Sequence, residues 1–259
     1  MDLLFSGDPT TLLLLVGAAF AGGLVDAIAG GGGLIVLPAL LAAGLPPHMA
    51  LGTNKLAGSF GTLGASLAFL RRGLFKPRHW PMTATLTAAG AAAGTVMVSI
   101  LDAALLRALV PPLIVVAGLY VMLRRPPPRL APAPPAREDR GSPFLGAGLG
   151  FYDGLVGPGT GAFWVSGLMG LWGLDLVQAS GVARAMNFVS NVVSLAAFAW
   201  FGMVDWAVGL MMAGALLAGA WIGAHSAIRY GAPFIRPVFL VVVLALAGHL
   251  AWEQWWAGP

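Results

Sequence analysis

Four charged side chains stand inside apolar stretches of this sequence, and their types and spacing indicate ion chemistry. Asp26 and Asp153 are about 127 residues apart, and each precedes a glycine-rich segment. Lys55 and Arg184 are about 129 residues apart, each within the next long apolar stretch. A charge near the bilayer centre costs at least about 2.5–3.5 kcal/mol, so it should face a cavity or a partner. We predict that the cations bind an anion and that the carboxylates serve proton coupling or charge balance. A structural ion pair is the alternative.

The glycine-rich segments could supply backbone donors to the same anion. A helix that starts after such a break exposes unpaired N–H groups and the positive end of its dipole, and glycine lets that backbone approach a ligand. The alternative is that the glycines only permit a tight bend and close packing. The predicted substrate site includes these residues of the two segments: Gly30, Gly31, Gly32 and Gly33, then Gly157, Gly159, Thr160 and Gly161.

Polar side chains follow both cations at helical spacing and form a stripe on each predicted helix. The stripes comprise Lys55, Ser59, Thr62 and Ser66 in the first half, and Arg184, Asn187, Asn191 and Ser194 in the second. Such stripes line hydrated paths in membrane proteins, and they also bond neighbouring helices. We assign the serines to helix packing. We predict Asn54, Asn187 and Asn191 as ligands or as supports of the site.

The composition indicates an integral membrane protein. Of the 259 residues, 58% are hydrophobic and 9% are charged, far from a soluble domain. Apolar stretches of about 20 residues recur, long enough to cross a bilayer core of about 30 Å. The absence of cysteine excludes disulfides and thiolate metal sites. The sequence shows no nucleotide-binding loop and no metal-ligand cluster, so we expect no cofactor.

The placement of the basic residues indicates a membrane topology rather than nucleic-acid binding. They gather at 71–78, 124–140 and 229–236, whereas the connections near Asp102 and Asp205 carry only Arg107. This alternation follows the positive-inside rule, which places the basic connections in the cytoplasm and both termini outside. The lipid bilayer is therefore the expected partner, and nucleic acid is not.

Two halves of similar organisation flank a proline- and arginine-rich segment, 124–141, which we predict as a cytoplasmic linker. The first transmembrane repeat is predicted over 1–123 and the second over 142–259. Apolar segments are expected at about 11–29, 34–44, 49–70, 80–101 and 105–123, then at about 143–157, 161–174, 176–201, 206–228 and 233–252. The loop after the third segment is basic only in the first half, which indicates that the repeats are inverted.

The expected fold is all-α, with each repeat made of a broken-helix hairpin and three transmembrane helices. Inversion requires an odd number of crossings per half, which the three long segments supply. The arm 34–44 spans about 16 Å, half a bilayer, so its hairpin should turn back near the midplane. Full crossings by both arms are the alternative. The pairs Gly90–Gly94 and Gly219–Gly223 are predicted to let helices approach closely.

Three stretches of the first half carry a resemblance to a known family: Gly30-Gly-Gly-Gly-Leu-Ile-Val-Leu-Pro-Ala-Leu-Leu41, Ala50-Leu-Gly-Thr-Asn-Lys55 and Arg71-Arg-Gly-Leu74. They resemble the sulfite exporter TauE/SafE family, a TSUP-type group of membrane transporters. The second half looks like a degenerate repeat, with Gly181-Val-Ala-Arg184 in the place of Gly52-Thr-Asn-Lys55. The resemblance implies a bacterial inner-membrane transporter that exports sulfite, sulfoacetate or related small sulfur oxyanions. In such a membrane, the positive-inside rule places both termini in the periplasm.

The combined prediction is a secondary transporter, not an enzyme. A small anionic sulfur-containing substrate would bind between the two bends and the two cations, with alternating access. Proton coupling and charge balance both stay open as roles of the carboxylates. An anion channel is the first alternative. A membrane enzyme of sulfur metabolism is the second, and it lacks a convincing pair of nucleophile and base in this sequence.

Overall fold

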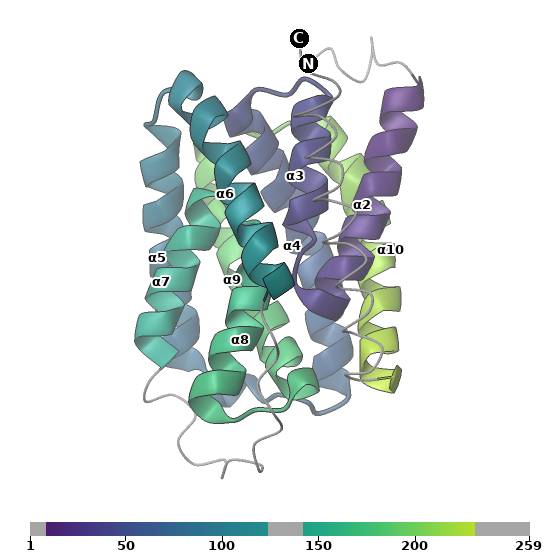
Figure 1. The fold of residues 1–259 in the computed structure, drawn as a ribbon, viewed down its shortest axis with the longest axis vertical. Coiled ribbons are helices and arrows are strands. Elements are labelled where there is room, and N and C mark those ends of the chain that lie inside the picture. Colours follow the sequence, from purple (N-terminus) through teal and green to yellow (C-terminus); the bar gives the residue numbers. More distant parts are fainter. Residues whose placement is uncertain (1–8, 124–141, 231–259) are drawn as a thin grey trace.

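The computed structural model describes residues 9–123 and 142–230, which form a bundle of helices without a strand in these ranges (Figure 1). The all-α prediction is confirmed. The helices are α2 (Pro9–Ala29), α3 (Gly33–Ala42), α4 (Pro47–Arg71), the 3-10 helix η1 (Pro77–His79), α5 (Pro81–Ser99), α6 (Ala103–Leu123), α7 (Ser142–Leu155), α8 (Thr160–Trp172), α9 (Leu176–Trp200) and α10 (Trp206–Tyr230). The predicted linker 124–141, the predicted segment 233–252 and both termini lie outside the described residues.

The two ends of the bundle differ in charge. The basic end carries the arginines at the ends of α4 and α10 and in the loop with η1, and the Arg71 guanidinium lies there 5.7 Å from the Trp221 ring centroid. The opposite end joins the starts of α4 and α10, where the Asp205 N–H donates to Thr53 Oγ1 at 3.0 Å. Helix α3 leads into the start of α4, and α8 leads into the start of α9. The hairpin α2–α3 therefore enters from the opposite end, and α7–α8 enters from the basic end (Figure 1).

The second arm of each hairpin is short. Helix α3 has 10 residues and α8 has 13, or about 15 Å and about 20 Å at about 1.5 Å per residue. Both are too short for a hydrocarbon core of about 30 Å. Among the described helices, α2, α5, α6, α9 and α10 contain stretches long and apolar enough to span a membrane. These lengths favour hairpins that turn back inside the bundle over full crossings by both arms.

Glycine pairs let α5 and α10 pack closely against the hairpin of the other half. A Cβ added at Gly94 of α5 would lie 2.1 Å from Phe151 O of α7, and one added at Gly219 of α10 would lie 2.1 Å from Phe20 O of α2. Gly90 and Gly223 make similarly close approaches to the same two partner helices. The prediction that these pairs serve helix packing is confirmed, because any side chain there would collide with backbone.

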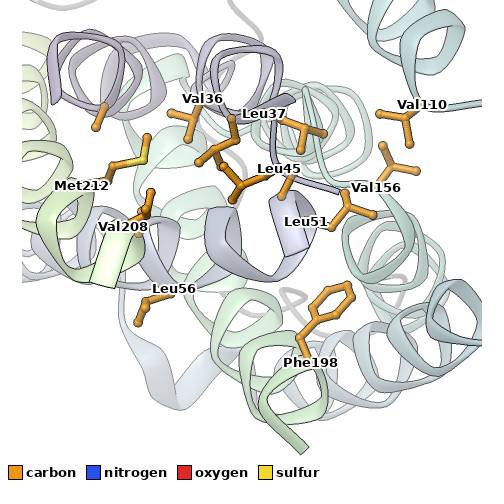
Figure 2. Close-up of a cluster of buried hydrophobic side chains, with 14 of the residues drawn as sticks. Val36, Leu37, Leu45, Leu51, Leu56, Val110, Val156, Phe198, Val208 and Met212 are labelled. Carbon is orange, nitrogen blue, oxygen red and sulfur yellow. The ribbon is translucent and has the colours of Figure 1, made fainter. Parts of the chain in front are cut away.

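Two hydrophobic clusters fill the two ends of the bundle. The leucine-rich cluster fills the opposite end around Leu37, Leu45, Leu51, Phe198 and Val208, contributed by α3, α4, α9, α10 and the loop before α4 (Figure 2). The aromatic cluster fills the basic end around Phe69, Phe75, Trp80, Trp164 and Val182. Along α4, Ser59 and Thr62 lie between the two clusters, and along α9, Asn187 and Asn191 do so. Lys55 lies among residues of the leucine-rich cluster and Arg184 among residues of the aromatic cluster. Apolar packing therefore lies on both sides of these polar residues.

Candidate functional site

The two glycine-rich bends meet inside the bundle. Gly30 and Gly157 adopt positive φ values of 88° and 93°, a backbone region that side chains rarely tolerate, so glycine permits each turn. The Ala162 N–H of one hairpin donates to Gly30 O of the other at 3.3 Å. A Cβ added at Gly33 would lie 3.3 Å from Pro158 Cα. The starts of α3 and α8 are thus brought together at one place.

Each buried cation pairs with the carboxylate of the hairpin in the other half. Lys55 Nζ lies 2.8 Å from Asp153 Oδ1, and Arg184 Nη1 lies 2.9 Å from Asp26 Oδ2. Arg184 Nη1 also donates to the backbone oxygen of Asp26. Both cationic side chains are only 1% exposed. The ion pairs considered from the sequence are therefore present in this conformation, and both of them cross between the halves.

The two carboxylates differ in how firmly they are held. Asp153 also accepts hydrogen bonds from Thr160 Oγ1 at 3.3 Å and from Ser190 Oγ, and its side chain is 6% exposed. Asp26 accepts the Gly32 N–H at 3.2 Å, close to the start of α3, and its side chain is 16% exposed. Asp26 is therefore the more accessible carboxylate. Each carboxylate accepts hydrogen bonds from groups that would otherwise be free to donate to an anionic ligand.

A cavity of about 40 Å³ lies between the bends and the polar faces of α4 and α9. A buried water needs at least about 10–15 Å³ on this measure, so the cavity holds roughly three water-sized groups. Its lining includes most of the predicted site residues: Asp26, Gly30, Gly32, Gly33, Asn54, Lys55, Asp153, Gly157, Gly159, Thr160, Gly161, Asn187 and Asn191. The structure thus gathers both halves of the predicted site around one small space.

Two predicted site residues lie outside this lining. Gly31 is next to the Leu34 side chain, 3.4 Å from a Cβ that would be added there. Arg184 packs against the bends, and its Nη2 would be 2.5 Å from a Cβ added at Gly161 and 2.9 Å from one added at Gly30. Arg184 therefore contacts both bends and the Asp26 carboxylate without lining the cavity.

The structure adds cavity residues that were not in the predicted site. Gly58 and Thr62 continue the face of α4 that carries Lys55, and Asn191 Nδ2 lies 3.5 Å from Thr62 Oγ1. Thr62 belongs to the polar stripe noted in the sequence, and the helical spacing of Gly58 from Lys55 could have identified it too. The other additions are Gly22, Val36 and Leu216. These are apolar residues of apolar helices, so nothing in the sequence distinguishes them from lipid-facing or core positions.

Ser190 was also missed, because it lies off the polar stripe of α9 and its partner Asp153 belongs to a distant segment. The serines assigned to packing do not line the cavity. Ser59 Oγ donates to Lys55 O of its own helix at 2.7 Å, whereas Ser66 Oγ and Ser194 Oγ are buried without a hydrogen-bond partner in the described part of the chain.

An apolar helical bundle with buried ion pairs around a small cavity is typical of an integral membrane protein. The chain belongs to the sulfite exporter TauE/SafE family, whose profile matches residues 14–250. The resemblance seen in the three first-half stretches is therefore confirmed, and the protein is a membrane transporter of the TauE/SafE type.

Curated relatives carry names that agree with this class. The chain is 39% identical to "Probable membrane transporter protein ORF9" of Sinorhizobium sp. over 92% of each chain. It is 39% identical to a "Probable membrane transporter protein" of Haemophilus influenzae, covering 96% of this chain and 97% of the relative. It is 34% identical to "Probable membrane transporter protein YfcA" of Escherichia coli, covering 97% and 93%. No solved structure matches the chain.

Proposed function

We propose that this transporter exports a small sulfur oxyanion, sulfite or a small organosulfonate, across the bacterial inner membrane by alternating access. The observation that carries the proposal is the pair of crossed ion pairs around a cavity at the starts of α3 and α8. Helix starts and buried cations both favour a bound anion. The family description, which names sulfite, supplies the substrate class.

The carboxylates explain how an empty site keeps its cations buried. Asp153 occupies Lys55 Nζ and Thr160 Oγ1, and Asp26 occupies the Gly32 N–H. An arriving oxyanion takes over these donors and displaces the carboxylates. The four charged groups are formally neutral together, so the added anion leaves a net negative charge in an apolar surrounding. For a singly charged anion such as hydrogensulfite, protonation of one carboxylate restores neutrality, which would couple transport to protons.

The size of the cavity and the apolar packing on either side of it support a carrier over a channel. A volume of about 40 Å³ suits a molecule with few heavy atoms, such as sulfite. The leucine-rich cluster lies toward the opposite end of the bundle, and the aromatic cluster lies toward the basic end. A ligand must pass apolar packing on either side, which suits a carrier that opens one side at a time, as alternating access requires.

The orientation and duplication belong to the same proposal. The basic end faces the cytoplasm, with the linker 124–141, and both termini face the periplasm. The repeats 1–123 and 142–259 are inverted copies. This view is supported by hairpins that enter from opposite ends and by glycine contacts that run reciprocally between α10 and α2 and between α5 and α7.

Single cysteines test the orientation, because the chain contains none of its own. The variants are Lys76→Cys, in the basic loop, and Ala42→Cys, at the end of α3. Both positions are exposed. In intact cells, a membrane-impermeant maleimide is expected to label position 42 and to spare position 76. Labelling of position 76 in intact cells would contradict the orientation, and a permeant maleimide that labels both controls for reactivity.

Counterflow of sulfite tests the function directly. Purified protein in proteoliposomes loaded with unlabelled sulfite is expected to accumulate external labelled sulfite, with saturation at high concentration. Sulfoacetate, taurine and sulfate serve as competitors, so their inhibition ranks the substrates. Absence of counterflow would contradict the carrier, as would unitary currents in planar bilayers, which are the mark of a channel. Turnover of sulfite to a product without transport would instead support the membrane enzyme.

A further inference from the structure

Trp164 is a wholly buried side chain whose polar atom has no partner. It is 0% exposed, and its Nε1 has no hydrogen-bond acceptor within the described residues. A buried donor without an acceptor destabilises the fold, and a buried tryptophan normally places its N–H against an acceptor. Packing alone would be better served by an apolar side chain. The free N–H therefore needs another explanation.

Trp164 lies between the cavity and the basic end of the bundle. Thr160 begins α8 and lines the cavity, and Trp164 follows four residues later on the same helix face. Helix geometry places it about 6 Å farther along α8. There it belongs to the aromatic cluster, together with Phe69 of α4 and Met186 of α9. Any ligand that leaves the cavity toward the basic end must displace or pass this cluster.

A second unpartnered donor lies on the same side. Arg184 Nε is buried without an acceptor in the described chain, although other atoms of its guanidinium bind Asp26. Gly161 packs against that guanidinium, and Trp164 follows Gly161 by three residues, one turn along the same face. Trp164 also packs in one cluster with Ala183 and Met186, the neighbours of Arg184 on α9, so both donors belong to the contact between α8 and α9. An oxyanion has enough acceptor lone pairs for both N–H groups.

The equivalent position of the first hairpin carries no such donor. Gly33 stands in the first hairpin where Thr160 stands in the second, at an offset of 127, and Leu37 stands where Trp164 stands. Leu37 is 0% exposed and belongs to the leucine-rich cluster. Within the described residues, the indole donor of the short arm is therefore specific to the side of the cavity that faces the basic end.

We propose that Trp164 Nε1–H and Arg184 Nε–H form a second, transient binding position for the oxyanion between the cavity and the basic end. This inference rests on the proposed transport function. The position is loaded when the aromatic cluster opens, so Trp164 determines how well the anion is taken up from the basic end. Uptake from the opposite end does not involve it.

Trp164→Phe tests this position, since it retains an aromatic ring and removes only the donor and part of the volume. Trp80→Phe is the matched control, because Trp80 is a buried tryptophan of the same cluster, packed edge-to-face on Trp172 at 6.2 Å. Saturable uptake of labelled sulfite is measured in inside-out and right-side-out membrane vesicles. For Trp164→Phe, the half-saturating concentration should rise about tenfold in inside-out vesicles, as expected for a lost hydrogen bond to a charged group. It should stay unchanged in right-side-out vesicles.

Two results would overturn the inference alone. One is unchanged uptake by Trp164→Phe in inside-out vesicles; the other is an equal shift in Trp80→Phe, which would indicate a packing role. Absence of saturable uptake by the wild type in both kinds of vesicle would overturn the proposed function and this inference with it. If Trp164→Phe fails to fold, 3-benzothienylalanine at position 164, which replaces only the N–H by sulfur, gives the same comparison.

Discussion

Lys55→Met is expected to abolish sulfite counterflow and to lower the stability of the protein by about 3–5 kcal/mol, because it leaves Asp153 buried without its cation. The double variant Lys55→Met with Asp153→Asn removes both charges. It should recover most of the lost stability, since the amide oxygen introduced at position 153 can still accept from Thr160 and Ser190, and the neutral pair no longer buries an uncompensated charge. Transport should remain absent, because the site has lost the positive charge of Lys55 that attracts the anion.

Thermal unfolding in detergent and counterflow in proteoliposomes measure the two effects separately. Arg107→Met is the control, because it removes an exposed cation of α6 and should alter neither quantity. Counterflow at the wild-type rate by the folded double variant would show that the pair of Lys55 and Asp153 is only structural. The same single and double substitutions can be made at Arg184 and Asp26, with one further expectation. Because Arg184 packs against the bends, Arg184→Met should also weaken the contact between Gly30 and Gly161.

Gly30→Ala is expected to abolish transport and to destabilise the fold strongly, because its Cβ would lie 2.4 Å from Ala162 N of the other hairpin. The bends would have to separate, which removes both the hydrogen bond from Ala162 N–H to Gly30 O and the cavity. Gly44→Ala is a matched control. Gly44 has a φ of 89° against 88° for Gly30, but nothing lies within 4 Å of a Cβ added there.

The control should therefore show only the cost of a left-handed backbone for an L-residue, about 1–2 kcal/mol, with transport retained. Thermal unfolding and sulfite counterflow of both variants give the comparison. The difference between them isolates the contact between the bends from the strain of a positive φ. Equal stability and equal transport in the two variants would contradict a functional role for the close approach.

The helices were largely predictable because short stretches of sequence determine where each one begins and ends. The expected segment 49–70 corresponds to Pro47–Arg71, and 176–201 corresponds to Leu176–Trp200. Long apolar runs bounded by proline, glycine or charge define membrane helices with little help from tertiary contacts. The glycine pairs were predictable for a related reason: small residues four apart on an apolar helix have few uses besides close packing.

The pairing of the charges was not predictable in the same way. The sequence offered Lys55 and Arg184 as cations and Asp26 and Asp153 as carboxylates, with every combination open. The structure selects the two pairs that cross between the halves, because each hairpin packs against helices of the other half. It also places Arg184 against the two bends and outside the cavity lining, where the sequence suggested a direct ligand. That outcome depends on how α8 lies against α9, which no local pattern encodes.

By itself, the sequence determined an all-α membrane protein of this transporter family, with two broken hairpins and four intramembrane charges. These features follow from hydropathy, glycine runs and the high cost of a charge in hydrocarbon, all of which act on short segments. Only the tertiary structure decided which carboxylate meets which cation, which apolar side chains complete the cavity, and that the Trp164 N–H is left without an acceptor among the described residues. Those properties arise where helices distant in sequence come within a few ångströms of each other, so they depend on packing rather than on composition.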